Sequence, residues 1–150
     1  MSYSTAHATA RRSPVQTVTV VIALVFTLVG VLGFVPAITS GFDSMTFAGH
    51  HSDARLLGVF EVSVLHNVVH LLFGIVGFLM ARTAGAAITY LVTGGAIYFV
   101  LFLYGLLIDL DSAANFVPVN DADNWLHLAL AVGMLALGAV FGRQARRATA

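Results

Sequence analysis

Four long apolar stretches, separated by short polar segments, dominate the hydrophobic pattern of the chain. They cover residues 15–37, 62–81, 86–108 and 126–141. A helix needs roughly 20 mostly apolar residues to cross a membrane, and the first three stretches have that length. The fourth is shorter, so we extend it outward through Asn124 and Trp125, because an indole side chain suits the headgroup layer. The pattern predicts an all-α protein, a four-helix transmembrane bundle.

The residues between the apolar stretches predict how the helices are connected. Pro14 suits the first turn of a helix, and Pro36 marks the point where the first helix must stop. Residues 82–85 form a tight connection, so the second and third helices should be antiparallel neighbours. We therefore expect two tandem antiparallel hairpins in one transmembrane domain (14–143), between a mobile cytoplasmic N-terminus (1–13) and a basic cytoplasmic tail (144–150).

The composition excludes a soluble domain. Of the 150 residues, 59% are hydrophobic and only 9% are charged, and the mean hydropathy is +0.92. Globular proteins carry about 25% charged residues, so this chain has too few to cover its own surface. The chain has no cysteine, which excludes a disulfide framework and thiolate chemistry.

The few charges are sorted along the chain in a way that predicts an orientation. With four spans, one side carries Arg11, Arg12, Arg82, Arg143, Arg146 and Arg147. The other side carries Asp43, Asp53, Glu61, Asp109, Asp111, Asp121 and Asp123, and Arg55 is the exception. Arginine near the ends of spans favours the cytoplasmic side. We therefore expect a multi-pass protein of the cell membrane with both termini in the cytoplasm.

A short signature, Asn-x-x-His-Leu, occurs near the start of the second and fourth apolar stretches. It begins at Asn67 and again at Asn124. Because each copy opens the second helix of a hairpin, the pattern indicates a weak internal duplication. Convergent residues at two helix entries are the alternative interpretation.

Four segments also resemble a known family. They are LGFVP (32–36), LGVFEV (57–62), HNVVHLLFG (66–74) and NDADNWLHL (120–128). With its paired Asn-x-x-His motifs, the chain resembles a family of small four-span bacterial membrane proteins that is common in actinobacteria and catalogued as a domain of unknown function. The resemblance implies a four-helix membrane topology and no particular activity.

Polar residues at membrane depth are costly and therefore form the candidate site. They are His66, Asn67, His70, Asn124, His127 and Glu61. Counting about 1.5 Å per residue along each span places the three histidines in the outer half of the bilayer. His66, His70 and His127 have the chemistry of a divalent metal site or, with two axial imidazoles, of a haem b site. Alternatively, the asparagines and His70 and His127 hydrogen-bond between helices, or the cluster handles protons or a ligand.

Charged residues at the ends of the spans and in the loops also have simpler interpretations. Glu61 could reach outer water at the membrane boundary and pair with Arg55. Asp121 or Asp123 would serve as the N-cap of the fourth helix. The sequence His50-His51-x-Asp53 resembles an opportunistic metal cluster, although adjacent histidines rarely share one ion.

The sequence contains no phosphate loop, catalytic triad, zincin motif or nucleic-acid surface. We therefore expect a protein that is not an enzyme, has no cofactor and does not bind nucleic acid. The leading prediction is an accessory or structural protein in the lipid bilayer. It would form a homo-oligomer or join a larger membrane complex through small-residue helix faces. Within the bundle, Gly138 and Gly142 of the fourth stretch are expected to match the small-residue face of the second, which includes Gly74 and Gly77. The alternatives are a haem- or metal-binding redox or ion-handling protein and a small oligomeric transporter or channel.

Overall fold

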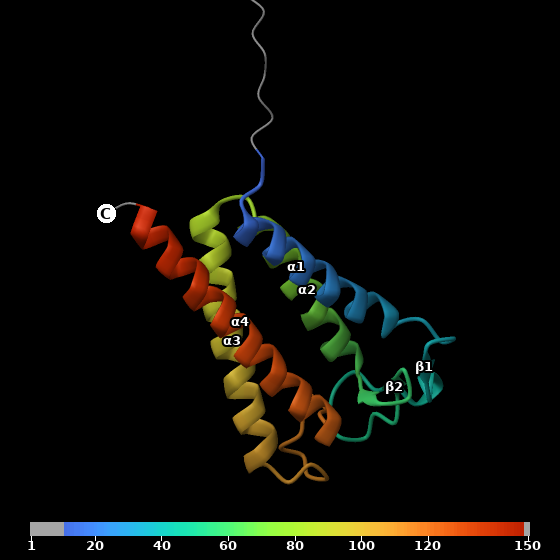
Figure 1. Cartoon of the computed structure of the whole chain (residues 1–150). Helices are drawn as coiled ribbons and strands as arrows, with labels where there is room; N and C mark the ends of the chain where they lie inside the picture. Colours follow the sequence, from blue (N-terminus) through green and yellow to red (C-terminus); the bar gives the residue numbers. More distant parts are fainter. Residues whose placement is uncertain (1–10, 149–150) are drawn as a thin grey trace, which may run out of the picture.

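A computed structural model describes residues 11–148 and shows a bundle of helices (Figure 1). The helices are α1 (Pro14–Leu32), α2 (Val64–Met80), α3 (Ala84–Leu107) and α4 (Asp121–Ala148). The predicted helical bundle is therefore confirmed. The predictions for the two ends of the chain fall partly on residues 1–10 and 149–150, which lie outside the described residues.

Three helices, α1, α3 and α4, are long and apolar enough to cross a membrane, which supports a membrane protein. Helix α2 is apolar but has 17 residues, about 25 Å at 1.5 Å per residue. The first helix ends earlier than predicted, at Leu32 instead of Ala37. There the Thr39 hydroxyl donates to the carbonyls of Leu32 (3.1 Å) and Gly33 (3.3 Å), which takes up acceptors left free at the helix end.

The helices pair as two hairpins. Helix α1 packs along α2, and α3 packs along α4, whereas α2 and α3 contact each other much less although a short turn joins them (Figure 1). Small residues allow the close approach inside each hairpin. A Cβ on Gly74 would lie 2.9 Å from the carbonyl oxygen of Ala23, and one on Gly95 would lie 3.1 Å from that of Ala131.

Most helix glycines are consequently used within the hairpins. Even on α4, a Cβ on Gly138 would lie 2.7 Å from a methyl group of Val92. Gly142 is less enclosed, with Ile88 at 3.8 Å, and a Cβ on Gly133 would meet nothing within 4 Å. The small-residue faces expected to bind other chains therefore mainly hold this chain together.

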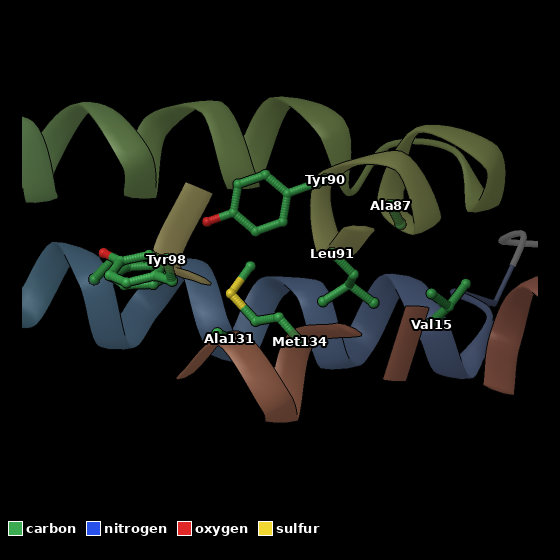
Figure 2. Packing of buried hydrophobic residues seen from close by; sticks show 8 residues of the cluster. Val15, Ala87, Tyr90, Leu91, Tyr98, Ala131 and Met134 are labelled. Atoms are coloured by element: carbon green, nitrogen blue, oxygen red, sulfur yellow. The ribbon is translucent and has the colours of Figure 1, made fainter. Parts of the chain in front are cut away.

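The core lies where the two hairpins meet. Its buried residues include Val15, Ala87, Tyr90, Leu91, Tyr98, Ala131 and Met134 (Figure 2). Phe26 of α1 stacks on Tyr98 of α3, with ring centroids 5.4 Å apart and planes 9° apart. This pair joins the first hairpin to the second.

The segment between α1 and α2 folds into a small sheet that the sequence pattern did not predict. Its strands are β1 (Thr39–Ser40), β2 (Arg55–Leu56) and β3 (Phe60–Glu61), antiparallel in that order. Between β2 and β3, Leu57 and Gly58 both have positive φ, as tight hairpins require. Buried Ala54, Leu56 and Val62 pack against the end of α1 and so close the bundle at this end.

The charge sorting appears directly in the structure. The start of α1, the α2–α3 turn and the C-terminal end of α4 lie at one end of the bundle, and all of the predicted inner arginines belong to these segments (Figure 1). The Asp and Glu residues occupy the segments at the other end. We call the first the basic end and the second the acidic end.

Candidate functional site

The structure brings His66, His70 and His127 together at the acidic end. All three are buried, and the ring centroids of His66 and His70 lie 4.4 Å apart. The three residues line two cavities of about 190 and 40 Å³. We call this group the histidine cluster.

Helix α2 positions its two histidines through its first turn. Ser63 is the N-cap, and its hydroxyl accepts a hydrogen bond from the backbone N–H of His66 (3.1 Å). The Nδ1 of His66 bonds to the carbonyl of Glu61 (2.9 Å), and that of His70 bonds to the carbonyl of His66 (3.1 Å). Since a carbonyl only accepts, both Nδ1 atoms carry a proton, and in the neutral imidazole both Nε2 atoms keep a lone pair.

Helix α4 contributes His127 and a carboxylate. The expected N-cap, Asp121 or Asp123, is wrong: the Asn120 side chain accepts from the backbone N–H of Asp123 (2.9 Å). Asp123 reaches back to the N–H of Asn120 (3.0 Å), so the two residues form a reciprocal capping box. The same Asp123 oxygen accepts from the backbone N–H of Glu61 (2.9 Å), which attaches α4 to β3.

The sequence predicted that the asparagines, His70 and His127 form hydrogen bonds between helices. The structure shows other contacts for them. The Oδ1 atoms of Asn67 and Asn124 and the Nδ1 of His127 are buried without a partner. The Asn67 amide donates to the sulfur of Met45 (3.8 Å), outside the bundle helices. His70 bonds to its own helix. The polar residues therefore contribute little direct bonding between α2 and α4.

Each asparagine instead packs against a glycine. A Cβ on Gly33 would overlap the Asn67 carboxamide, with its Cγ at 2.5 Å, and one on Gly105 would approach the Asn124 Cγ to 2.8 Å. A glycine offers no side-chain group to bond, which explains why the asparagine oxygens stay unpaired. Asn67 is completely buried and Asn124 nearly so.

The metal and haem hypotheses receive no support. Among residues 11–148, no group of three or more His, Asp or Glu side chains is arranged to hold a metal ion. This applies to His66, His70 and His127 and also to the His50–His51 segment, whose two rings lie against each other at 3.9 Å. The larger cavity, about 190 Å³, is below the roughly 300 Å³ at which ligand pockets for drug-sized molecules begin, and a haem does not fit it.

Glu61 contributes its backbone and not its carboxylate to the site. Its N–H and carbonyl hold Asp123 and His66, while its side chain is half-buried and does not line either cavity. Burial raises the pKa of Glu61 above its ordinary value of 4.5, and the charge of Arg55 offsets part of that effect.

Sequence reasoning missed Asp123 as a member of the site, although the internal duplication contained the signal. Aligning Asn67 with Asn124 also aligns His66 with Asp123. On the second helices, the same alignment also matches Ser63 with Asn120 and His70 with His127. The first helices need a separate alignment with a larger offset, which matches Phe26 with Tyr98 and Gly33 with Gly105.

The two cavities lie on corresponding sides of the histidine cluster. The larger is lined by Val29 and Leu32 of α1, and the smaller by Leu101 and Tyr104, the matching positions of α3. The larger cavity also includes Asp123. The repeat therefore generates two cavities of different size at corresponding positions, and only the larger one is lined by a carboxylate.

The larger cavity opens on the apolar outside of the bundle. Val25, Leu28 and Leu57 line it and are 49%, 48% and 65% exposed. A molecule dissolved in the apolar phase would meet this opening before it met the histidines. The site can thus admit a polar group from the side while an apolar tail stays outside.

Comparison with known proteins gives a family and no activity. The model of a family described as a domain of unknown function (DUF4383) matches residues 16–140. No curated protein matches the chain. No solved structure matches it either.

Proposed function

The chain belongs to this family of domains of unknown function (DUF4383), and because the family description names no activity, we propose a function from the site itself. The protein is a multi-pass protein of the cell membrane that binds a small lipophilic molecule and is not an enzyme. The basic end and both termini face the cytoplasm, by the preference of arginine for that side. Helix α2 crosses the membrane together with α1, α3 and α4.

The observation that carries this proposal is the larger cavity, apolar at its mouth and polar at its inner end. Three of the polar residues that line it present acceptors. His66 and His70 each keep an Nε2 lone pair, and Asp123 has a second carboxylate oxygen. The molecule bound there should therefore donate hydrogen bonds, through a hydroxyl or an amine, and carry an apolar tail. A carboxylate or phosphate ligand would face acceptors and is disfavoured.

Other functions have weaker support. An accessory protein associating through small-residue faces retains three open glycines on the second hairpin, Gly85 on α3 and Gly133 and Gly142 on α4. A Cβ on any other glycine of these two helices would come closer than 3 Å to the facing helix. A redox role would need a haem or metal, and the described residues do not fit either group.

The test uses two probes of equal chain length that differ only in the donor. Dodecanol and dodecyl methyl ether are titrated into the purified full chain carrying isotope-labelled histidine, and the imidazole resonances are followed by NMR. We expect dodecanol to shift the resonances of His66 and His70. The ether should have a much smaller effect, and His50 and His51 should not respond.

Two variants locate the binding. Leu126→Trp obstructs the cavity and should abolish the shifts, whereas Val132→Trp, at an exposed position of α4 outside the cavity, should preserve them. Equal responses to the alcohol and the ether, or no response to either, would contradict the proposal.

A further inference from the structure

The basic end contains a further cavity, separate from the two at the histidine cluster. Its volume is about 750 Å³, within the range of roughly 300–1,000 Å³ typical of ligand pockets. Arg11 and Arg12, just before α1, and Arg82, in the α2–α3 turn, all line it. Two segments far apart in the sequence thus direct three guanidinium-bearing residues to one space.

A fixed contact between the two segments holds this arrangement. The Gln16 amide donates to the carbonyl of Ala81 (2.9 Å) and to that of Arg82 (2.8 Å). The Gln16 carbonyl oxygen accepts from the N–H of Ser13 (2.9 Å), next to Arg12. One side chain therefore joins the start of α1 to the α2–α3 turn and occupies two backbone acceptors that would otherwise disfavour an anion.

The positive charge of this cavity is not balanced by a nearby carboxylate. In the part of the chain that the structure describes, every Asp and Glu lies in the segments of the acidic end, and none borders the cavity. The first turn of α1 contains no acidic residue, so the positive end of its dipole adds to the arginine charge. The electrostatics favour an anion.

The walls of the cavity indicate which anion. Below the arginines it is lined by Val20 and Phe78, which lie on the membrane-spanning parts of α1 and α2. A cationic rim over an apolar wall, at the level where the helices leave the membrane, matches a phosphate headgroup continued by acyl chains. Arginine suits this role because its planar donors bind phosphate oxygens in pairs.

We infer that Arg11, Arg12 and Arg82 form a binding site for the headgroup of an anionic phospholipid of the inner leaflet. The site is independent of the proposed ligand at the histidine cluster, since the two lie at opposite ends of the bundle. Its consequence is that the α1–α2 hairpin carries a bound lipid at its basic end.

The experiment measures lipid binding to the full chain in nanodiscs of phosphatidylcholine, with or without phosphatidylglycerol, by native mass spectrometry. The wild type should retain phosphatidylglycerol in preference to phosphatidylcholine. Each cavity arginine lost should weaken that preference about fivefold, so Arg12→Gln combined with Arg82→Gln should weaken it more than tenfold. Arg82→Lys keeps the charge but not the paired donors, so it should weaken the preference for phosphatidylglycerol less than Arg82→Gln does.

The matched control is Arg143→Gln with Arg147→Gln, which removes the same charge from the same end but outside the cavity. It should leave the preference within about twofold of wild type. An equal loss in both double variants would show a general surface attraction and overturn the site, provided that both unfold at the wild-type temperature. Competition by inorganic phosphate at millimolar concentration would identify a soluble anion and overturn the lipid assignment.

Discussion

The first hairpin, α1 with α2, and the second, α3 with α4, place corresponding residues in corresponding contacts. Gly33 near the end of α1 faces Asn67 of α2, and Gly105 near the end of α3 faces Asn124 of α4. Along the core, the first hairpin has its glycine on the second helix, where Gly74 of α2 packs on Ala23 of α1. The second hairpin has its glycine on the first helix, where Gly95 of α3 packs on Ala131 of α4. Close approach therefore needs one small residue at each crossing, on either helix.

The hairpins differ most at the third residue of their second helices. The first has His66 and the second has Asp123, and both reach the backbone of Glu61. The glycine and asparagine contacts are therefore similar in the two hairpins, whereas the polar groups at the acidic end differ. This difference indicates that the glycine and asparagine positions hold the hairpins together, while the third position adds a different polar group from each hairpin to the larger cavity.

The largest effect should come from filling the two asparagine contacts. Gly33→Ala and Gly105→Ala each insert a methyl group into a buried carboxamide, and each should lower the free energy of unfolding by about 1–3 kcal/mol. Gly133→Ala is the control, because its Cβ meets nothing within 4 Å. Unfolding by denaturing detergent measures all three. If only one of the two substitutions destabilises, the hairpins are not equivalent.

The next effect concerns the helix starts. Ser63→Ala removes one N-cap hydrogen bond and should cost about 0.5–2 kcal/mol. Asp123→Ala should cost more than Ser63→Ala, because its carboxylate accepts from the backbone N–H groups of both Asn120 and Glu61. The same unfolding assay compares them. A smaller cost for Asp123→Ala would show that the attachment of α4 to β3 does not stabilise the fold.

A smaller difference is expected between the two matching histidines. His70→Leu loses a hydrogen bond to the His66 carbonyl and should cost about 0.5–1.5 kcal/mol. His127→Leu removes a ring whose Nδ1 is buried without a partner, so it should be neutral or stabilising. Thermal unfolding distinguishes them. Equal destabilisation would contradict the conclusion that the Nδ1 of His127 has no hydrogen-bond partner.

The smallest effect is that of Glu61, which has Pro118 at the matching position of the second hairpin. Because burial raises the folded-state pKa of Glu61 above 4.5, ionisation opposes folding. Its contribution is most favourable below pH 4.5 and is lost as the pH rises through the raised value. Glu61→Gln should remove this pH dependence and change stability at pH 7 by no more than about 0.5 kcal/mol. Unfolding measured between pH 4 and 7 tests it, and an unchanged pH profile would contradict the assignment.

Some of the site followed from local pattern and some did not. The i, i+4 spacing of His66 and His70 placed them on one face of a helix, and the repeated signature placed His127 at the same depth. The expected bonds between helices were wrong because the residue opposite each asparagine is a glycine, and pairing across helices depends on their relative rotation. The sheet at residues 39–61 was missed because strands of two residues are too short to show alternation.

By itself, the sequence determined the four helical segments, their tight connection at Arg82 and the separation of charge between the two ends. These properties depend on the composition of continuous stretches and on the cost of exposing apolar or charged groups to the wrong solvent. Only the tertiary structure decided that Asp123 joins the histidines, that a glycine faces each asparagine and that a cavity opens beside Leu28. Those outcomes depend on how two hairpins of similar plan pack together, and no single segment contains that information.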